Sequence, residues 1–282
     1  MSMAILARSI AILILALVVM TTTQAGAQPQ LIGSIEFEYG AATESENADM
    51  RERLMSRRTL EELVQFLSPL KLPQKLRIVT EECPARSAEN AFYSTTTSTI
   101  TICYQYVSLF ARYAAEPDML PGFTREEIFV GSFLSTVLHE LGHAVFHLLD
   151  IAVFGHEEDA ADQIATFVML QFGPDVARTT IKGAAYKWFK AAISRPATYY
   201  DTHGTPAQRY YNTLCIAYGG QPNTFRDLAG GGLLPRSRIE ACALEYAQVR
   251  RAFEETLLPH IDRQLLNQVL ARRWLRAGDG AR

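Results

Sequence analysis

Apolar and polar residues alternate early in the chain, which is the pattern of half-buried β-strands. Residues 32–39 read Ile-Gly-Ser-Ile-Glu-Phe-Glu-Tyr, so we expect a strand there, followed by a polar connector over residues 40–49. A second strand is expected over residues 75–83. Residues 91–107 are rich in Thr, Tyr and Ile and predict further strands around a Ser/Thr-rich turn.

The rest of the chain shows the longer spacing of amphipathic helices. One helix is expected over residues 51–67, ended by Pro69 and Pro73. Thr124, with Glu127 three residues later, resembles a capping box and predicts the start of a long helix. Further helices are expected over residues 157–172, 175–193, 206–218, 238–258 and 261–273.

Strands therefore come first and helices later, which is typical of an α+β protein. We expect a small antiparallel or mixed sheet in a β-rich part over about residues 30–107. A predominantly helical body over about residues 108–273 follows it. Residues 28–282 are long enough to bury one sizeable core and are interpreted as one domain.

The N-terminal residues have the pattern of a secretory signal. Arg8 precedes the apolar run 10–20, and Ala25-Gly26-Ala27 forms a small-residue cleavage site, so residues 1–27 are predicted to be a signal peptide. The alternative is an uncleaved anchor, but the run is well short of the roughly 20 residues needed to span a bilayer. We therefore expect a periplasmic or secreted protein with no stable membrane span after cleavage.

Charge and composition exclude several classes of partner. The formal net charge is −3, and 48% of the residues are hydrophobic. This near-neutral surface provides no basic footprint for nucleic acid and no polybasic patch for anionic lipid. The composition is also unlike that of a disordered chain.

Four cysteines follow the predicted signal, and an exported protein would pair them. Three connectivities are possible, and we expect the disulfides Cys83–Cys103 and Cys215–Cys242 because each joins adjacent predicted elements. A structural zinc site of four thiolates is the alternative, but the sequence has no C-x-x-C knuckle.

The candidate chemistry lies in the long helix, where residues 137–144 read Val-Leu-His-Glu-Leu-Gly-His-Ala. His139 and His143 are one helical turn apart, so both imidazoles can reach one metal ion, and Glu140 lies where it can act as a general base. The alternative is a pair of core histidines. Burying an ionised Glu140 without a partner is costly, however, and a nearby cation removes that cost.

A catalytic zinc needs a third protein ligand and an open position. The metzincin pattern requires Gly and His where this chain has Phe146 and Leu149, so that class is excluded. His147 continues the same helix face and is expected to pack or support, because three histidines on successive turns do not easily converge on one ion. His156 remains a further option.

The better candidate begins the next helix, which reads Glu-Glu-Asp-Ala-Ala-Asp over residues 157–162. Glu158 and Asp162 share a helix face, so Glu158 can bind the metal while Asp162 orients a ligand histidine. Glu157 and Asp159 are interpreted as partners of the helix dipole only.

These motifs, HELGH followed by E-x-x-A-D, resemble those of the gluzincin metallopeptidases, and especially the CAAX-protease and heat-shock peptidase group. The resemblance implies a zincin-like fold with His139, His143 and Glu158 on the metal. In that group T-H-P precedes an arginine, and here Thr202-His203 precedes Arg209 at the same spacing, with Gly204 in place of the proline. The resemblance implies that His203 stabilises the oxyanion and that Arg209 braces the site near the ligand carboxylate.

Over most of its length, the predicted mature chain is also similar to a family of bacterial metallopeptidases. The matching segments are Asn90–Tyr93, Ile102–Tyr104, His139–His143, Glu157–Asp162 and Asn212–Tyr218.

The sequence thus predicts a zinc endopeptidase with one catalytic Zn²⁺, acting on a peptide or protein that adds as a strand to the sheet edge near residues 99–104. One alternative is an exported zinc-binding protein that keeps the scaffold for a structural or interaction role without turnover. Another is a self-cleaving or chaperone-activated peptidase.

Overall fold

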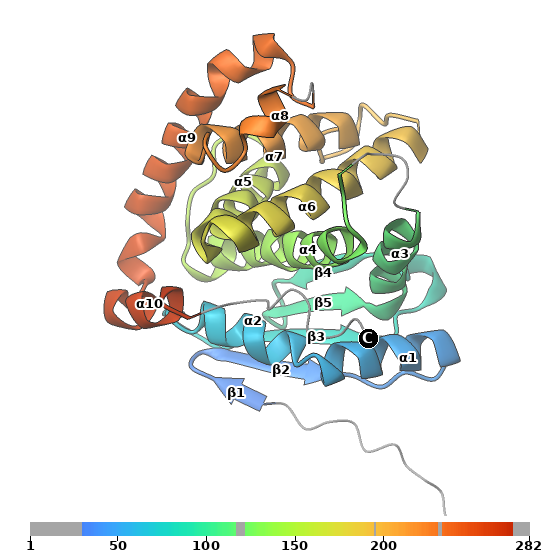
Figure 1. Cartoon of the computed structure of the whole chain (residues 1–282). Helices are drawn as coiled ribbons and strands as arrows, with labels where there is room; N and C mark the ends of the chain where they lie inside the picture. Colours follow the sequence, from blue (N-terminus) through green and yellow to red (C-terminus); the bar gives the residue numbers. More distant parts are fainter. Residues whose placement is uncertain (1–29, 117–121, 195, 231–232, 273–282) are drawn as a thin grey trace, which may run out of the picture.

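The computed structural model describes residues 30–116, 122–194, 196–230 and 233–272. The predicted signal peptide, residues 1–27, lies outside these ranges and stays a prediction. Figure 1 shows a small sheet built by the N-terminal part of the chain and a larger helical body built by the rest. The prediction of an α+β protein that is mostly helical, with an N-terminal mixed sheet, is confirmed.

The sheet has five strands in the spatial order β1-β2-β3-β5-β4. Their bounds are β1 (Gln30–Ile32), β2 (Ile35–Tyr39), β3 (Leu76–Glu81), β4 (Ala91–Ser94) and β5 (Thr99–Cys103). β2, β3 and β5 run parallel, while β1 and β4 pair antiparallel at the two edges. The expected substrate edge near residues 99–104 is therefore wrong: β5 is paired on both sides, and the open edge beside it is β4.

Ten α-helices lie in the described part of the chain. Their bounds are α1 (Ser45–Ser56), α2 (Thr59–Leu67), α3 (Tyr104–Ala115), α4 (Arg125–Leu148), α5 (Glu157–Met169), α6 (Pro174–Ser194), α7 (Pro206–Gly220), α8 (Arg226–Gly230), α9 (Arg236–Thr256) and α10 (Arg263–Leu270). The capping box at the start of α4 is present, with the Thr124 side chain accepting from the Glu127 backbone N–H.

Several boundaries differ from the sequence prediction. The single helix expected over residues 51–67 is two helices, because Arg58 has a left-handed backbone with φ of 52° and ends the first one. The first of them begins at Ser45, inside the predicted polar connector. The strand region predicted to reach residue 107 ends at Cys103, where α3 begins and buries Tyr104 and Val107.

The sheet is apolar on one face only. Phe37, Ile78 and Ile100 stand side by side in the register and are buried on that face. Alternate residues of β2 and β3 point the other way, and Glu36, Glu38 and Arg77 among them carry charge, with an ion pair between Arg77 and Glu38. The helices therefore cover a single face of the sheet.

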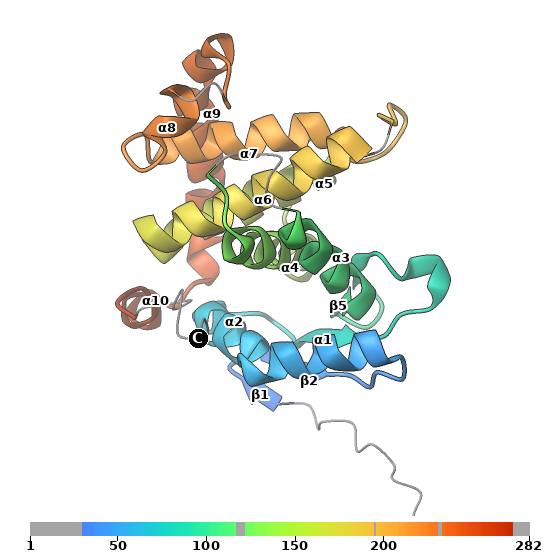
Figure 2. The ribbon, with the colours of Figure 1, turned by 45° about the vertical axis from the view of Figure 1, so that its right-hand side comes forward.

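Helix α4 lies between the sheet and α6 (Figures 1 and 2), and α7 is stacked beyond α6. α4 and α6 cross closely because glycines face each other: a β-carbon at Gly183 would stand 1.8 Å from the Glu127 carbonyl oxygen. In the described ranges α4 is the one helix long and apolar enough to cross a membrane, but 89% of the apolar window is buried, as in a core helix.

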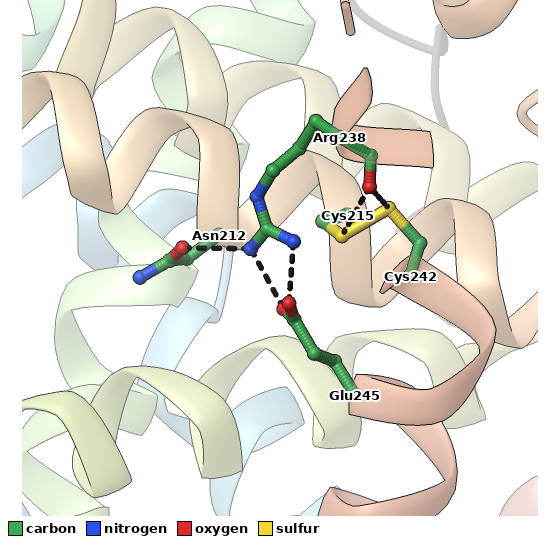
Figure 3. The surroundings of a disulfide bond; sticks show 5 residues. All are labelled: Asn212, Cys215, Arg238, Cys242 and Glu245. Carbon is green, nitrogen blue, oxygen red and sulfur yellow. Dashed lines mark hydrogen bonds and ion pairs between the residues drawn. A yellow bond between two sulfur atoms is a disulfide. The ribbon is translucent and has the colours of Figure 1, made fainter. Parts of the chain in front are cut away.

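Two disulfides join Cys83 to Cys103 and Cys215 to Cys242, with Cα atoms 5.4 Å and 4.8 Å apart. This is the pairing expected from the sequence, and it is consistent with an exported protein. The first disulfide joins the segment just after β3 to the last residue of β5, and the second joins α7 to α9. Beside the second, Figure 3 shows the Arg238 guanidinium reaching Glu245 and the Asn212 side chain.

Candidate metal centre

Helix α4 carries the HELGH motif at its buried centre. His139 and Glu140 are 6% and 7% exposed, and His143 lies one turn further along. Helix α5 packs against this turn at short range, because a β-carbon at Gly142 would stand only 2.8 Å from the Ala161 Cα. Small residues on both helices thus bring the acidic start of α5 to the two histidines.

Three potential ligand atoms converge between α4 and α5. The Oε2 atom of Glu158 lies 3.1 Å from His139 Nε2 and 3.2 Å from His143 Nε2, and the two Nε2 atoms are 3.3 Å apart. Ligands at about 2.0–2.1 Å from a tetrahedral zinc lie about 3.3 Å from one another. The spacing of these atoms therefore suits a small divalent cation bound by His139, His143 and Glu158.

The other ring nitrogens of the two histidines contact carboxylates. His139 Nδ1 lies 2.9 Å from Asp162 Oδ1, and His143 Nδ1 lies 2.6 Å from Glu157 Oε1. Because an ionised carboxylate only accepts, each Nδ1–H is the donor in these contacts. When a ring carries no second proton, its Nε2 lone pair faces Glu158. Two lone pairs and an anionic oxygen then face one another, an arrangement that a metal cation stabilises.

Protons, in place of a metal ion, can also bridge the imidazole nitrogens and the Glu158 carboxylate. Burial lowers the pKa of His143, but hydrogen bonds to Glu158 and Glu157 outweigh it and raise that pKa to about 9. For Glu158, burial is outweighed by hydrogen bonds from His139, His143 and His203, which hold its pKa far below the ordinary value. Metal and protons thus compete for one set of donor atoms.

Asp162 is itself held by Arg209. The guanidinium donates from Nε to Oδ2 and from one terminal nitrogen to Oδ1, both at 2.6 Å. Burial alone would raise the pKa of Asp162, but the charge of Arg209 and the hydrogen bond from His139 lower it well below the usual range. The Arg209 guanidinium also stacks 3.6 Å over the Trp188 ring. Arg209 therefore holds the partner of a candidate ligand histidine, and one of its terminal nitrogens also lies 3.4 Å from His139 Nδ1.

His203 reaches the centre from the loop before α7. Its Nε2 lies 2.9 Å from Glu158 Oε2, and its Nδ1 lies 3.0 Å from Asp201 Oδ1. The hydrogen bond to Glu158, opposed by burial and assisted by Asp201, raises the pKa of His203. Next to it, a β-carbon at Gly204 would stand 3.2 Å from the Asp159 carboxylate, a close contact that a small shift of this side chain would relieve.

Glu140 points to a cavity of about 1170 Å³ that opens beside the three candidate ligands. Burial raises the pKa of Glu140, while the nearby rings of His139 and His143 act in the opposite direction. The cavity is lined by β4 and by helices α3, α4, α5, α6 and α7, together with the loop before α7. The cavity is large enough to hold several residues of an extended peptide.

The other sequence candidates have different surroundings. His147 contacts the Tyr93 hydroxyl through Nδ1 at 2.9 Å, and His156 precedes α5; both line the cavity, outside the group of three converging ligand atoms. Glu157, interpreted from the sequence as a dipole partner only, also receives the His143 Nδ1–H. The signal in the sequence that could have indicated this contact is the position of Glu157 directly before Glu158.

The fold and this site define an α+β protein with a candidate metal centre of two histidines and one carboxylate. A family model described as "Putative metallopeptidase" (DUF4344) matches residues 39–257, and the chain belongs to this family. The family description indicates a metal-dependent peptidase acting on peptides or proteins. No curated protein and no solved structure matches the chain significantly.

Proposed function

We propose that the protein is an exported zinc endopeptidase of gluzincin type with a zincin-like fold. The observation that carries this proposal is the convergence of His139 Nε2, His143 Nε2 and Glu158 Oε2 beside Glu140. Imidazole and carboxylate donors in this number are typical of catalytic zinc. Held by His139, His143 and Glu158, a zinc ion would supply Lewis acidity at this point of the cavity.

The residues of the chain perform the proton transfers and the positioning. Glu140 accepts the proton of the attacking water and delivers it to the leaving amine. His203, which lies between two carboxylates, donates a hydrogen bond to the developing oxyanion. Asp162 and Glu157 fix the ring orientation of His139 and His143, and Arg209 holds Asp162 in place.

Removal of the metal tests the proposal directly. We expect the purified protein to hold about one zinc per chain by atomic spectroscopy and to cleave unfolded protein substrates. A chelator should remove both the zinc and the cleavage, and one equivalent of zinc should restore both. A protein that holds zinc but cleaves nothing would favour the exported zinc-binding role without turnover. Cleavage that persists without metal would contradict both.

The open edge strand suggests how substrate binds. The Cys103 backbone N–H donates to the Asn90 carbonyl at 3.2 Å, so the alternation of an antiparallel ladder turns the N–H and C=O of Ala91 away from β5. Ala91 lines the cavity. An extended substrate can therefore pair with β4 at this residue.

The replacement Ala91→Pro removes this outward N–H and leaves the pairing with β5 intact. We expect KM to rise about tenfold, the effect of losing about one main-chain hydrogen bond, with kcat and zinc content unchanged. Steady-state kinetics of this variant and of Ala91→Ser, which keeps the N–H, provide the measurement. An unchanged KM would exclude pairing at this strand.

A further inference from the structure

Three lysines of helix α6 are buried, and their polar partners differ. Lys182 pairs with Glu127 at 2.8 Å, and Lys190 pairs with Glu116 at 2.7 Å. The ammonium of Lys187, which is 4% exposed, donates to the Thr136 hydroxyl at 2.9 Å and has no carboxylate of the described residues within 4.0 Å. An ammonium buried without a counter-ion destabilises a fold, so its retention calls for a functional reason.

Lys187 forms part of the wall of the catalytic cavity. Thr136, which holds its ammonium, lies one helical turn before Glu140 on α4. The nitrogen stands 4.3 Å from the centre of the Trp188 ring and 5.9 Å from that of Phe110. A cation with aromatic and hydroxyl neighbours keeps its capacity to bind an anion.

Of the lysine and arginine side chains that line the cavity in the described ranges, Lys187 is the one without a carboxylate partner. Among the described residues that line the cavity, Lys187 and Arg209 are the lysine and arginine present, and Arg209 is engaged with both oxygens of Asp162. Burial, together with the charge of Arg209, lowers the pKa of Lys187 to about 7, while Asp162 and Glu140 act in the opposite direction. A bound anion would restore the charged form.

We propose that Lys187 is a specificity-determining residue that binds a carboxylate of the peptide substrate close to the scissile bond. The carboxylate belongs either to an acidic side chain or to a free C-terminus, since these are the anions that a peptide carries. The inference rests on the proposed peptidase function, because the cavity and Glu140 are shared with it.

Matched peptides test the proposal. One pair differs only by Glu or Gln near the cleaved bond, and a second pair differs only by a free or amidated C-terminus. We expect the wild-type zinc enzyme to prefer the acid of one pair by about tenfold or more in kcat/KM, the value of a charge-assisted hydrogen bond. The pair that shows the preference identifies the source of the carboxylate. Equal rates within both pairs would overturn the proposal.

The variant Lys187→Met distinguishes recognition from a structural role. We expect it to lose the acid preference and to unfold at a higher temperature, because a buried charge without a counter-ion is removed. Lys182→Met is the matched control: it breaks the pair with Glu127, so it should unfold at a lower temperature and keep the acid preference. An acid preference that survives Lys187→Met, or a fall in its melting temperature, would contradict the proposal.

Peptide binding, measured without cleavage, distinguishes failure of this proposal from failure of the proposed peptidase function. If no peptide is cleaved, the peptidase function fails, and calorimetric titration of the same peptides into the zinc-loaded Glu140→Gln protein still tests Lys187. A preference for the acid that the added Lys187→Met replacement removes would support the carboxylate site. The same affinity for acid and amide would exclude it.

Discussion

The replacement Glu140→Gln is expected to abolish peptide cleavage while the protein keeps about one zinc per chain. Glu140 lies in the cavity beside the three converging ligand atoms but is not one of them, so the amide leaves the metal donors intact. Gln has nearly the same shape and cannot accept the proton of the attacking water. Loss of a general base typically costs between about 10² and 10⁴ in rate. Zinc analysis and kcat/KM on the same preparation provide the measurement.

His203→Gln supplies the comparison for this variant. His203 contacts Glu158 from the loop side and is proposed to stabilise the oxyanion, so its loss should lower kcat by about 10²-fold at unchanged zinc content. If Glu140→Gln retained wild-type turnover, Glu140 would not be the base. A Glu140→Gln protein that lost its zinc would instead show that this carboxylate holds the metal.

The part of the site contained in one helix could be predicted from the sequence. His139, Glu140 and His143 are close because a helix returns to the same face after one turn, which depends on local geometry alone. Glu158 and Asp162 follow the same rule within α5. Spacing alone could not decide which of Glu157 and Glu158 is the candidate metal ligand and which is the partner of a histidine. The rotation of α5 against α4 decides which ring nitrogen each carboxylate contacts.

Contacts that depend on the tertiary fold could not be predicted from the sequence. Lys187 stands in a helix whose lysines would ordinarily face water, and only the close crossing of α4 and α6 buries it. The sequence predicts a substrate edge at residues 99–104, which lie inside the sheet, because strand order follows from crossovers that the hydrophobic pattern does not reveal. The break between α1 and α2 at Arg58 has no Gly or Pro to mark it.

The adjacent residues Glu157 and Glu158 allow the sharpest test of the metal centre. Glu158 Oε2 faces both Nε2 atoms, whereas Glu157 meets only the Nδ1 of His143 on the opposite side of the ring. Glu158→Ala should therefore remove a ligand and leave the protein with little zinc and no cleavage. Glu157→Ala should keep all three ligands and weaken zinc binding by about 10- to 100-fold, as expected for the partner of a ligand histidine.

Both variants remove one acidic residue from the first turn of α5, so their effects on net charge and on the helix dipole are matched. A difference between them in zinc affinity, measured by competition with a chelator, must then come from the side of the imidazole that each carboxylate faces. Equal affinities would contradict Glu158 as the third ligand. A greater loss in Glu157→Ala would exchange the two roles and require α5 to be rotated against α4.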